Sequence, residues 1–331
     1  MKEFTAKLII CPECKGKVTL KILSQSEEIE EAIFTCNKCS SWYPVSNGIA
    51  NMLPEHLSDK KTRKEFKEKW KLNLEIKENQ KLEADKQKQI DFYNEDVEHY
   101  DENLESTPFW QANDWNCIKT WLPKTEKGQL MIDMGCGTGR ASFPFAKKGV
   151  NVIGYDISVG MVTRAKAKAK KLGLEKNMDF LVGDGDNPPF KKRSFDFCIV
   201  FGVLHHVPEP RTVLKSIRNM LKDDGLYFGH ENNKSKVRFL FDLSMKIFKL
   251  WNEEAGNHPL ISEDEIKKWG LEADLIIKPK TSVFLPPHLY NLVGHKGAKK
   301  LISYSDAFFQ MIPFYKHQGG ALIIEGKPRV E

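Results

Sequence analysis

The sequence contains no long apolar run. No stretch of about 18 or more apolar residues occurs in its 331 residues, and the opening residues, MKEFTAKLII, lack the charged, apolar and small-residue segments of a secretory signal. These absences argue against a membrane-spanning helix and against secretion. We therefore expect a soluble, cytoplasmic protein, with peripheral membrane contact and the oligomeric state left open. An apolar content of 40% is ample for a buried core.

Cysteine is scarce, and its placement argues against a disulfide framework. Four of the seven cysteines form two CxxC pairs, CPEC and CNKC, with 21 residues between the pairs. This division favours a metal site in a reducing compartment. Four thiolates in a tetrahedral array suit structural zinc and leave no open position for a substrate. The sequence therefore predicts a structural Zn²⁺ ion bound by Cys11, Cys14, Cys36 and Cys39.

Glycine and proline are absent between residues 55 and 100, where Lys, Glu and Gln are dense. This composition predicts one or two helices that link the cysteine-containing domain to the rest of the chain. The formal net charge of +6 comes largely from the segment between Lys60 and Lys88. Its mixed charges favour a solvated helix, and a surface for nucleic acid or anionic lipid is the alternative.

A glycine-rich turn follows a short apolar strand in QLMIDMGCGTGR, residues 129–140. Gly135, Gly137 and Gly139 allow the backbone to approach a ligand closely, and a helix that starts after them offers its N-terminal dipole. A dinucleotide-binding fingerprint would have glycine at position 140, where this chain has Arg140. The motif therefore argues against a nicotinamide cofactor.

Acidic residues end the next apolar strands. The stretch NVIGYDIS contains Asp156, which is placed to accept hydrogen bonds from two ribose hydroxyls, and MDFLVGDGD contains Asp184. A fourth strand starts at Phe195, and a fifth follows the turn in DDGLYFGHEN. Because the carboxyl ends of successive βα units meet at one edge of a parallel sheet, these residues predict a ligand site at that edge.

This succession of motifs resembles the class I S-adenosylmethionine-dependent methyltransferases from about Tyr100 to the C-terminus. The resemblance implies an α/β fold, a Rossmann-like doubly wound sheet of seven strands, with S-adenosyl-L-methionine as the cofactor. It places Asp133 near the cofactor's amino group, Asp156 on the ribose and Asp184 on the adenine amino group. The cofactor-binding residues that it implies are Asp133, Gly135, Gly137, Gly139, Asp156, Ile157, Asp184, Gly185 and Phe201.

The segment after the second cysteine pair, SSWYPVSNGIANMLPE, carries a second resemblance. It is similar to the small zinc-ribbon protein that activates tRNA, rRNA and release-factor methyltransferases as a separate subunit, over about Leu8 to Pro54. The two resemblances together imply three parts. These are a zinc ribbon at 1–54, a charged helical linker at 55–100 and a methyltransferase domain at 101–331, with substrate-side insertions at about 232–262 and 280–318.

The tetrapeptide Asn187-Pro188-Pro189-Phe190 looks like the catalytic motif of methyltransferases that act on exocyclic or amide nitrogens. In those enzymes the motif follows the fourth strand, whereas here it precedes that strand. We therefore interpret it as a turn whose prolines stiffen the loop and whose Phe190 enters the core. It does not predict amide or adenine methylation.

Four residues near the ends of the fourth and fifth strands are candidates for catalysis. His205 and His206 follow the fourth strand, where a general base could deprotonate an acceptor hydroxyl or an acidic carbon, and a capping or packing role stays open. His230 and Glu231 end the fifth strand. Residues 236–251 then predict an apolar helix, either packed on the core or acting as a lid over the acceptor.

Two functions follow from these observations. We favour methylation of a small apolar, aromatic, lipid or glycan-type molecule at oxygen or carbon, with the ribbon as a built-in stabiliser. The alternative is modification of RNA or of a translation protein, with the ribbon and the basic linker providing recognition. The position of the tetrapeptide and the lack of a recognisable RNA-binding module argue against the alternative. A zinc-braced binding protein without activity is disfavoured because every cofactor position is intact.

Overall fold

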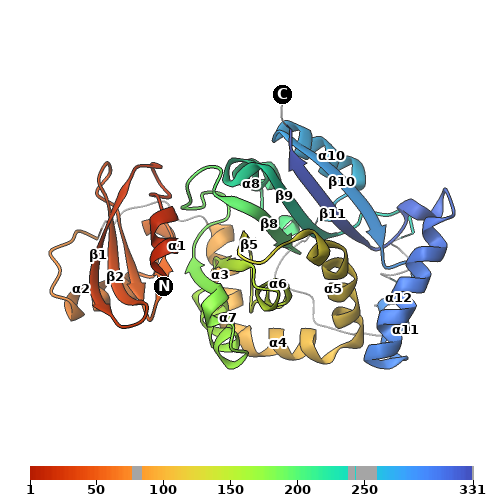
Figure 1. Cartoon of the computed structure of the whole chain (residues 1–331), viewed down its shortest axis with the longest axis horizontal. Coiled ribbons are helices and arrows are strands. Elements are labelled where there is room, and N and C mark those ends of the chain that lie inside the picture. Colours follow the sequence, from red (N-terminus) through yellow and green to blue (C-terminus); the bar gives the residue numbers. More distant parts are fainter. Residues whose placement is uncertain (77–83, 238–242, 244–258, 330–331) are drawn as a thin grey trace.

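The computed structural model describes residues 1–76, 84–237, 243 and 259–329 (Figure 1). An eleven-stranded sheet runs through it, and seven of the strands, in the order β7-β6-β5-β8-β9-β11-β10, form the central sheet, with β11 antiparallel to both of its neighbours. These strands are β5 (Leu130–Met134), β6 (Asn151–Asp156), β7 (Met178–Val182), β8 (Phe195–Phe201), β9 (Leu221–Asn232), β10 (Leu275–Ser282) and β11 (Ala321–Pro328). The predicted seven-stranded sheet is confirmed.

Helices cover both faces of this sheet because the strands are apolar on both sides. Met131 and Val152 face a core cluster that α5, α6 and α7 cover, whereas Ile132 and Ile153 face a cluster covered by α8 and α10. The helices are α5 (Pro108–Trp121), α6 (Phe143–Lys147), α7 (Val159–Lys171), α8 (Pro210–Met220) and α10 (Glu263–Glu272). Because these helices cover the faces of the sheet, the carboxyl ends of the parallel strands are left available for a ligand site.

Two further groups of helices pack on the helices that cover the sheet. Helices α3 (Ala84–Glu95) and α4 (Val97–Ser106) come from the predicted linker and the residues after it, and both contact α7. Helices α11 (Pro287–Asn291) and α12 (Gly294–Gln310) pack against α5, at the end of the molecule opposite the N-terminal ribbon (Figure 1). Most of the predicted apolar helix at 236–251 lies outside the described residues. No helix in the described ranges is long and apolar enough to cross a membrane.

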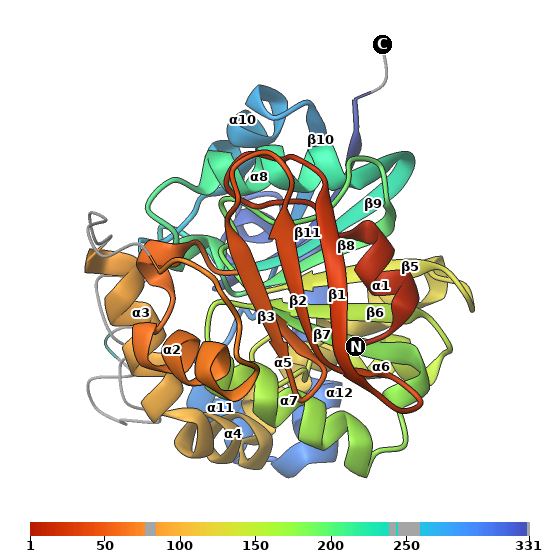
Figure 2. The ribbon, with the colours of Figure 1, turned by 90° about the vertical axis from the view of Figure 1, so that its left-hand side faces the viewer.

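The N-terminal ribbon extends the central sheet. It consists of α1 (Glu3–Leu8) and the antiparallel strands β1 (Val18–Gln25), β2 (Ile29–Cys36), β3 (Trp42–Ser46) and β4 (Ile49–Asn51). Strand β4 pairs in parallel with β7, with Ala50 opposite Leu181, and the Met52 N–H donates to the Val182 carbonyl at 2.7 Å. The ribbon therefore covers a sheet edge that would otherwise expose unpaired backbone groups (Figure 2).

A second contact joins the ribbon to the turn at 187–190. The Ile10 N–H donates to the Pro189 carbonyl at 2.8 Å. Phe190 is buried and packs edge to face on Phe195, with ring centroids 5.3 Å apart. The predicted burial of Phe190 is confirmed, and the structure adds that this segment holds the ribbon.

The described start of the lysine-rich segment is a helix with most of its side chains in solvent, as its mixed charges favoured, but one face of it is buried. Helix α2 (Lys60–Lys69) packs on the ribbon, where Phe66 stacks on Trp42 and the Arg63 guanidinium lies 3.8 Å from the centre of the Trp42 ring. Arg63 is buried and pairs with the buried Glu55 at 3.8 Å. One face of this helix is therefore an interface with the ribbon, which the charges alone did not reveal.

Candidate functional site

A cavity of about 830 Å³ lies at the carboxyl ends of β5 to β9, bordered by α3 and α4. Its wall includes the predicted cofactor residues Gly135, Gly137, Asp156, Ile157, Asp184, Gly185 and Phe201 and the predicted catalytic residues His205, His206 and His230. Asp133, Gly139 and Glu231 do not reach the wall. The volume falls in the range of about 300–1,000 Å³ that is usual for small-molecule and cofactor sites.

The glycine loop after β5 brings bare backbone to the cavity. Gly135 and Gly137 have positive φ angles of 71° and 50°, and a Cβ atom at Gly135 would lie 2.3 Å from Val203. The Gly137 N–H donates to Oδ2 of Asp156 at 2.8 Å. Gly139 also has a positive φ, of 89°, but lies behind the wall. The loop conformation therefore depends on glycine at these positions.

Two of the predicted cofactor acids differ in their surroundings. Asp156, at the end of β6, lines the cavity, and its oxygens accept the N–H groups of Gly137 and Ser158 at 2.8 and 2.9 Å. Asp133, in β5, is fully buried, and neither of its oxygens has a hydrogen-bond partner among the described residues. Burial raises the pKa of Asp133 to about 7 and also raises the pKa of Asp156. A buried carboxylate without a hydrogen-bond partner is uncommon in folded proteins.

Helices α3 and α4 close over the cavity through contacts that the sequence did not predict. Lys86 forms ion pairs with Asp184 at 2.7 Å and with Asp186 at 2.8 Å. Asp101 accepts a hydrogen bond from the Thr138 hydroxyl of the glycine loop at 2.6 Å. The partners are 98 residues apart for Lys86 and Asp184 and 37 apart for Asp101 and Thr138, so no local pattern in the sequence links them.

His205 and Glu231 form a buried pair at the ends of β8 and β9. Nδ1 of His205 lies 2.6 Å from one carboxylate oxygen of Glu231, whose other oxygen accepts the N–H groups of Val203 and Leu204. Burial alone would raise the pKa of Glu231, but His205 and the Leu204 N–H outweigh it, and the pKa is lowered. Glu231 is therefore an ionised group that orients His205 from behind the cavity wall.

His206 and His230 have different partners. Nε2 of His206 lies 3.3 Å from the Tyr93 hydroxyl on α3. His230 stacks on Phe201, with ring centroids 4.6 Å apart, and its Nε2 lies 3.1 Å from the Asn113 amide nitrogen. Burial lowers the pKa of His230 to about 4, so its ring is neutral at neutral pH. With Nε2 accepting from Asn113, the proton is on Nδ1, which is buried and has no partner among the described residues.

Arg140 adds a positive charge beside these rings. Its guanidinium pairs with Asp114 of α5 at 2.5 Å and lies 5.1 Å from the Phe201 ring centre and 5.8 Å from the Trp110 ring centre. Burial alone would lower the pKa of Arg140, but Asp114 outweighs it and raises the pKa. In the sequence, Arg140 argues only against a dinucleotide fingerprint. The sequence does not reveal Asn113, Asp114 and Trp110 as site residues, because nothing in α5 distinguishes them from core residues.

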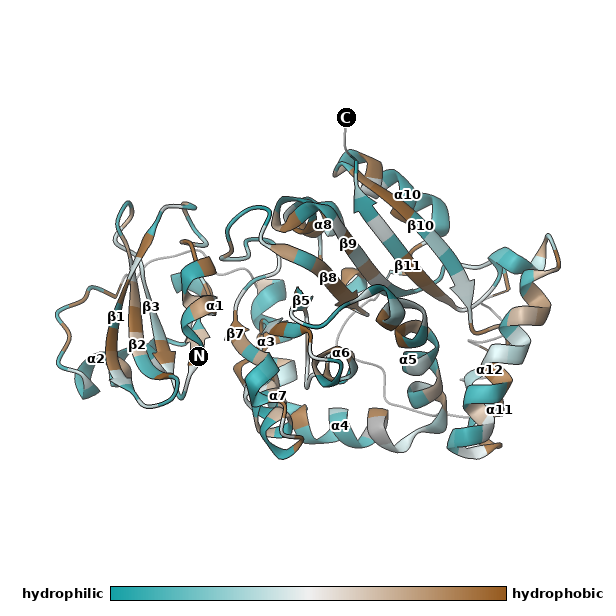
Figure 3. Cartoon of the chain, in the orientation of Figure 1, coloured by the Kyte–Doolittle hydropathy of each residue, from teal (hydrophilic) through white to brown (hydrophobic). Residues whose placement is uncertain are grey.

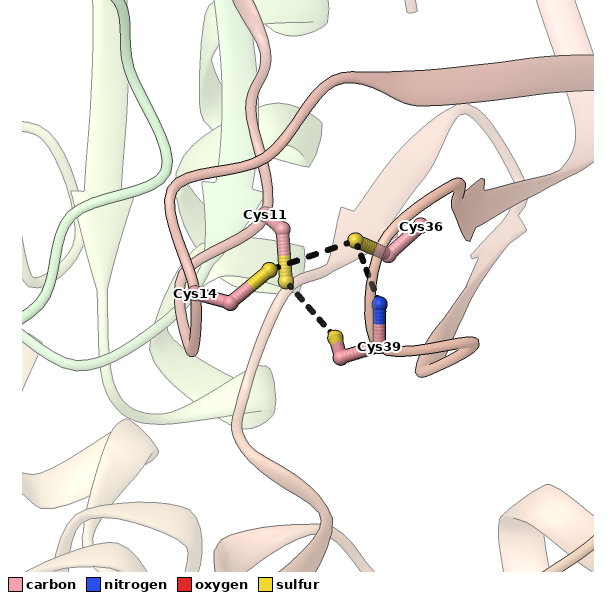
Figure 4. Close-up of side chains that lie close together, drawn as sticks. All are labelled: Cys11, Cys14, Cys36 and Cys39. Atoms are coloured by element: carbon pink, nitrogen blue, oxygen red, sulfur yellow. Dashed lines mark hydrogen bonds between the residues drawn. The ribbon is translucent and has the colours of Figure 1, made fainter.

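The four predicted zinc ligands converge in the ribbon (Figure 4). The Sγ atoms of Cys11 and Cys39 are 3.6 Å apart, those of Cys14 and Cys36 are 3.4 Å apart, and all four lie within 4.8 Å of one another. A tetrahedral ion with Zn–S bonds of about 2.3 Å separates its sulfurs by about 3.8 Å, so the cluster has the size that zinc requires. The predicted convergence of the two CxxC pairs is confirmed.

Comparison with known proteins identifies two parts of the chain. Residues 132–229 match the methyltransferase domain family, and residues 2–48 match the Trm112p-like protein family. Over 115 residues the chain is 33% identical to the demethylmenaquinone methyltransferase of Paenarthrobacter aurescens, which covers 35% of this chain and 43% of that protein. It is 33% identical over 159 residues to the sterol 24-C-methyltransferase of Saccharomyces cerevisiae, covering 42% of each. The chain thus spans less than half the length of these two relatives.

A solved structure shares the fold. A chain from the complex between the Haloferax volcanii Trm112 methyltransferase activator and a protein described as a methyltransferase superposes with a TM-score of 0.52 at 19% identity. The superposition covers 73% of this chain and 98% of that chain. Both predicted family resemblances and the predicted class I methyltransferase fold are confirmed by these comparisons and by the sheet order.

Proposed function

Because the chain joins a class I methyltransferase domain to a Trm112p-like zinc ribbon, we propose that it transfers a methyl group from S-adenosylmethionine to oxygen or carbon of a small apolar acceptor. The observation that carries this proposal is the cavity, whose wall runs from the glycine loop after β5 to the rings at the ends of β8 and β9. The first part has the groups that a nucleoside cofactor needs, and the second has an apolar wall with a buried histidine–carboxylate pair.

The residues near β5, β6 and β7 fit S-adenosylmethionine. Gly135 offers backbone where a Cβ atom would clash, and Asp156 can accept hydrogen bonds from ribose hydroxyls. The orphaned carboxylate of Asp133 suits the cofactor's ammonium group, and Asp184 would share its oxygens between Lys86 and the adenine amino group. When bound, the cofactor supplies the electrophilic methyl group.

We assign proton removal from the acceptor to His205. Because Glu231 accepts the Nδ1 proton of His205, the ring lone pair is on Nε2, which can take a proton from a hydroxyl or an acidic carbon. Glu231 is then a positioning residue, since it is fully buried and stabilises the ring after protonation. His206 would instead anchor the α3 helix through Tyr93.

We assign to His230 the binding of a second oxygen of the acceptor. Its ring is neutral, its Nε2 accepts from Asn113, and its Nδ1 proton has no partner within the described chain. A donor held in this way suits a carbonyl, phenol or enolate oxygen beside the atom that is methylated.

The acceptor that fits this wall is an apolar ring compound that carries oxygen. Trp110, Phe201 and Leu260 provide apolar surface, and the Arg140 guanidinium can interact with oxygen-bearing or π-electron-rich groups. The relatives named for demethylmenaquinone and sterol methylation support an acceptor of this class, over the part of their length that the chain matches.

We propose further that the four ribbon cysteines bind a structural zinc ion as thiolates. Four protein ligands complete a tetrahedral site and leave no position for a substrate. The ion would then stabilise the ribbon rather than take part in methyl transfer.

The test is transfer of labelled methyl groups from S-adenosylmethionine into a cell extract, which is then separated into organic-soluble, RNA and protein fractions. We expect label in the organic-soluble fraction, and we expect a His205→Asn variant to lose most of it. His295→Asn, an exposed histidine outside the cavity, is the matched control. Label in RNA or protein instead would favour the second function, modification of RNA or a translation protein, for which the Trm112p-like domain is the supporting observation.

A further inference from the structure

Exposed apolar side chains concentrate on α12 and the turn after it. Among the large apolar residues that the structure describes, the most exposed are Leu292 (79%), Met311 (74%) and Tyr304 (71%). Figure 3 shows hydrophobic residues at the C-terminal end of α12, at the edge of the molecule farthest from the ribbon. The α12 patch consists of Leu292, Val293, Tyr304, Phe308, Met311, Phe314 and Tyr315. Apolar groups that gather on a surface in this way mark interaction sites.

The patch continues into a row of lysines along the same helix. Tyr304, Phe308 and Met311 are spaced by four and three residues, so they share one face, and Lys296 and Lys300 extend that row toward the start of α12. The other face of the helix is buried against α5. The exposed face therefore carries Lys296 and Lys300 between Leu292 and Val293 before the helix and the apolar side chains toward its end.

The segment that contains the α12 patch is rich in lysine and poor in acidic residues. Between Leu275 and Ile324 the single acidic residue is Asp306, whereas six lysines occur there. Asp306 is buried and faces Asn116 and Ser282, so it does not reduce the positive charge at the surface as an exposed acid would. The segment is complementary in charge to an anionic partner.

We propose that the α12 patch docks on an anionic lipid surface. The aromatic and aliphatic side chains would be buried at the boundary between headgroups and acyl chains, and the lysine row would contact the anionic headgroups. Docking itself is independent of the chemistry in the cavity. Its use to the enzyme rests on the proposed function, because an apolar acceptor partitions into a bilayer. Helix α12 packs on α5, the helix that carries Trp110 of the cavity wall, so docking would bring the cavity near the membrane.

Two other occupants fit the patch less well. Single-stranded RNA gains from stacking on aromatic rings, but Leu292, Val293 and Met311 have no ring on which a base can stack. A second copy of the chain would offer the lysine row no exposed acid from this segment, because Asp306 is its single acidic residue and is buried. The mixture of aliphatic, aromatic and lysine side chains favours lipid.

Co-sedimentation of the full-length protein with vesicles tests this proposal. The probes are vesicles of phosphatidylcholine alone and of phosphatidylcholine mixed with phosphatidylglycerol, at low and high salt, without cofactor or acceptor. We expect binding to the mixed vesicles that weakens when phosphatidylglycerol is omitted or salt is added. A triple variant, Tyr304→Ser with Phe308→Ser and Met311→Ser, should lower the partition coefficient by about tenfold or more, and so should Lys296→Glu with Lys300→Glu.

Matched controls separate the patch from general effects of hydrophobicity and charge. Leu271→Ser with Ile276→Ser removes exposed apolar side chains elsewhere, and Lys170→Glu with Lys171→Glu makes the same change in net charge on α7. Both controls should bind vesicles as the unchanged protein does. The proposal fails if the protein does not bind mixed vesicles at low salt, or if the controls lose binding as the patch variants do. It also fails if the patch variants abolish a dimer or RNA binding while vesicle binding persists. Because no methyl transfer is measured, this failure is distinct from failure of the proposed function.

Discussion

Glu231 lies behind the cavity wall, where it pairs with His205 and accepts two backbone N–H groups. A substitution of Glu231 therefore tests the proposed base without removing a side chain that contacts a ligand. If His205 is the base, Glu231→Gln should lower the rate of methyl transfer by about 10²- to 10⁴-fold, because the amide cannot stabilise the protonated ring. The measurement is the pH dependence of label incorporation into the organic-soluble fraction, together with the affinity for S-adenosylhomocysteine, which should change little.

The control for this substitution is Glu325→Gln, which alters a carboxylate of β11 that pairs with Lys124 outside the cavity. Its rate should equal that of the unchanged protein. An unchanged rate and pH profile in Glu231→Gln would rule out His205 as a base that depends on this carboxylate.

Substitution of Asp133 should raise the stability of the protein while it lowers the affinity for the cofactor. Its pKa is raised to about 7 by burial, against about 3.9 in an unfolded chain, so the folded state resists ionisation. The contribution of Asp133 to the free energy of unfolding therefore falls as the pH rises from about 4 to about 7 and changes no further above that range. Asp133→Asn should raise the melting temperature at about pH 8 and have little effect at about pH 4.

The same variant should weaken binding of S-adenosylhomocysteine by about 1–3 kcal/mol, because the carboxylate that suits the cofactor's ammonium group is gone. Thermal melting at the two pH values and calorimetric titration at neutral pH are the measurements. A variant that is no more stable at high pH, yet binds the cofactor product normally, would contradict both roles of Asp133.

Individual residues were predicted where one strand-end motif defines them, and missed where a partner from a distant segment does. Gly135, Gly137 and Asp156 line the cavity as their spacing predicted. Lys86 was missed because its partner Asp184 is 98 residues away, and a lysine in a charged segment resembles any solvated lysine. His205 and Glu231 were both candidates, but their spacing in the sequence does not show that one orients the other.

Among the elements, the turn at 187–190 connects the ribbon to the loop that contains Asp184. Its Pro189 carbonyl accepts the Ile10 N–H, and Ile10 directly precedes the first zinc knuckle. Cys36→Ser should therefore lose zinc, lower the melting temperature by about 5 °C or more, and weaken binding of S-adenosylhomocysteine. Metal content, thermal melting and calorimetric titration test the three effects.

Cys117→Ser is the control, since this cysteine lies in α5 and outside the metal cluster. It should keep its zinc. Loss of zinc from Cys36→Ser with no change in melting would contradict a structural role for the ion, and unchanged cofactor affinity would contradict the coupling through the turn.

The elements of the central sheet were predictable because parallel strands are buried on both faces and are therefore continuous apolar runs. The ribbon–core junction was not. Strand β4 has three residues, which are too few to show a periodicity. Its partner β7 begins only at Met178, far along the chain, so no local pattern indicates the pairing. The mixed charges of α2 predict exposed side chains but do not show which face is buried. That face is set by the contacts of Phe66 and Arg63 with Trp42, which lies in another segment of the chain.

At the scale of the whole molecule, the ribbon and the core share one sheet, so neither is expected to behave independently. A chain without residues 1–51 leaves the β7 edge, with its buried Leu181 and Val182, open to pairing with other chains. We expect this truncated chain to aggregate and to be recovered in soluble form when the ribbon is co-expressed. Size-exclusion chromatography with light scattering measures both outcomes, and a stable monomeric core would show that β4 is dispensable.

Because β4 and β7 pair within one chain, the ratio of ribbon to core is fixed at one to one. When two proteins meet along a sheet edge, the fraction that is paired falls as they are diluted. Because the ribbon and the core belong to one chain, the ribbon stays near the β7 edge at an effective concentration on the order of millimolar, which dilution of the protein does not change. Every molecule therefore has one ribbon for one core, and the occupancy of the β7 edge does not depend on the concentration of a second protein.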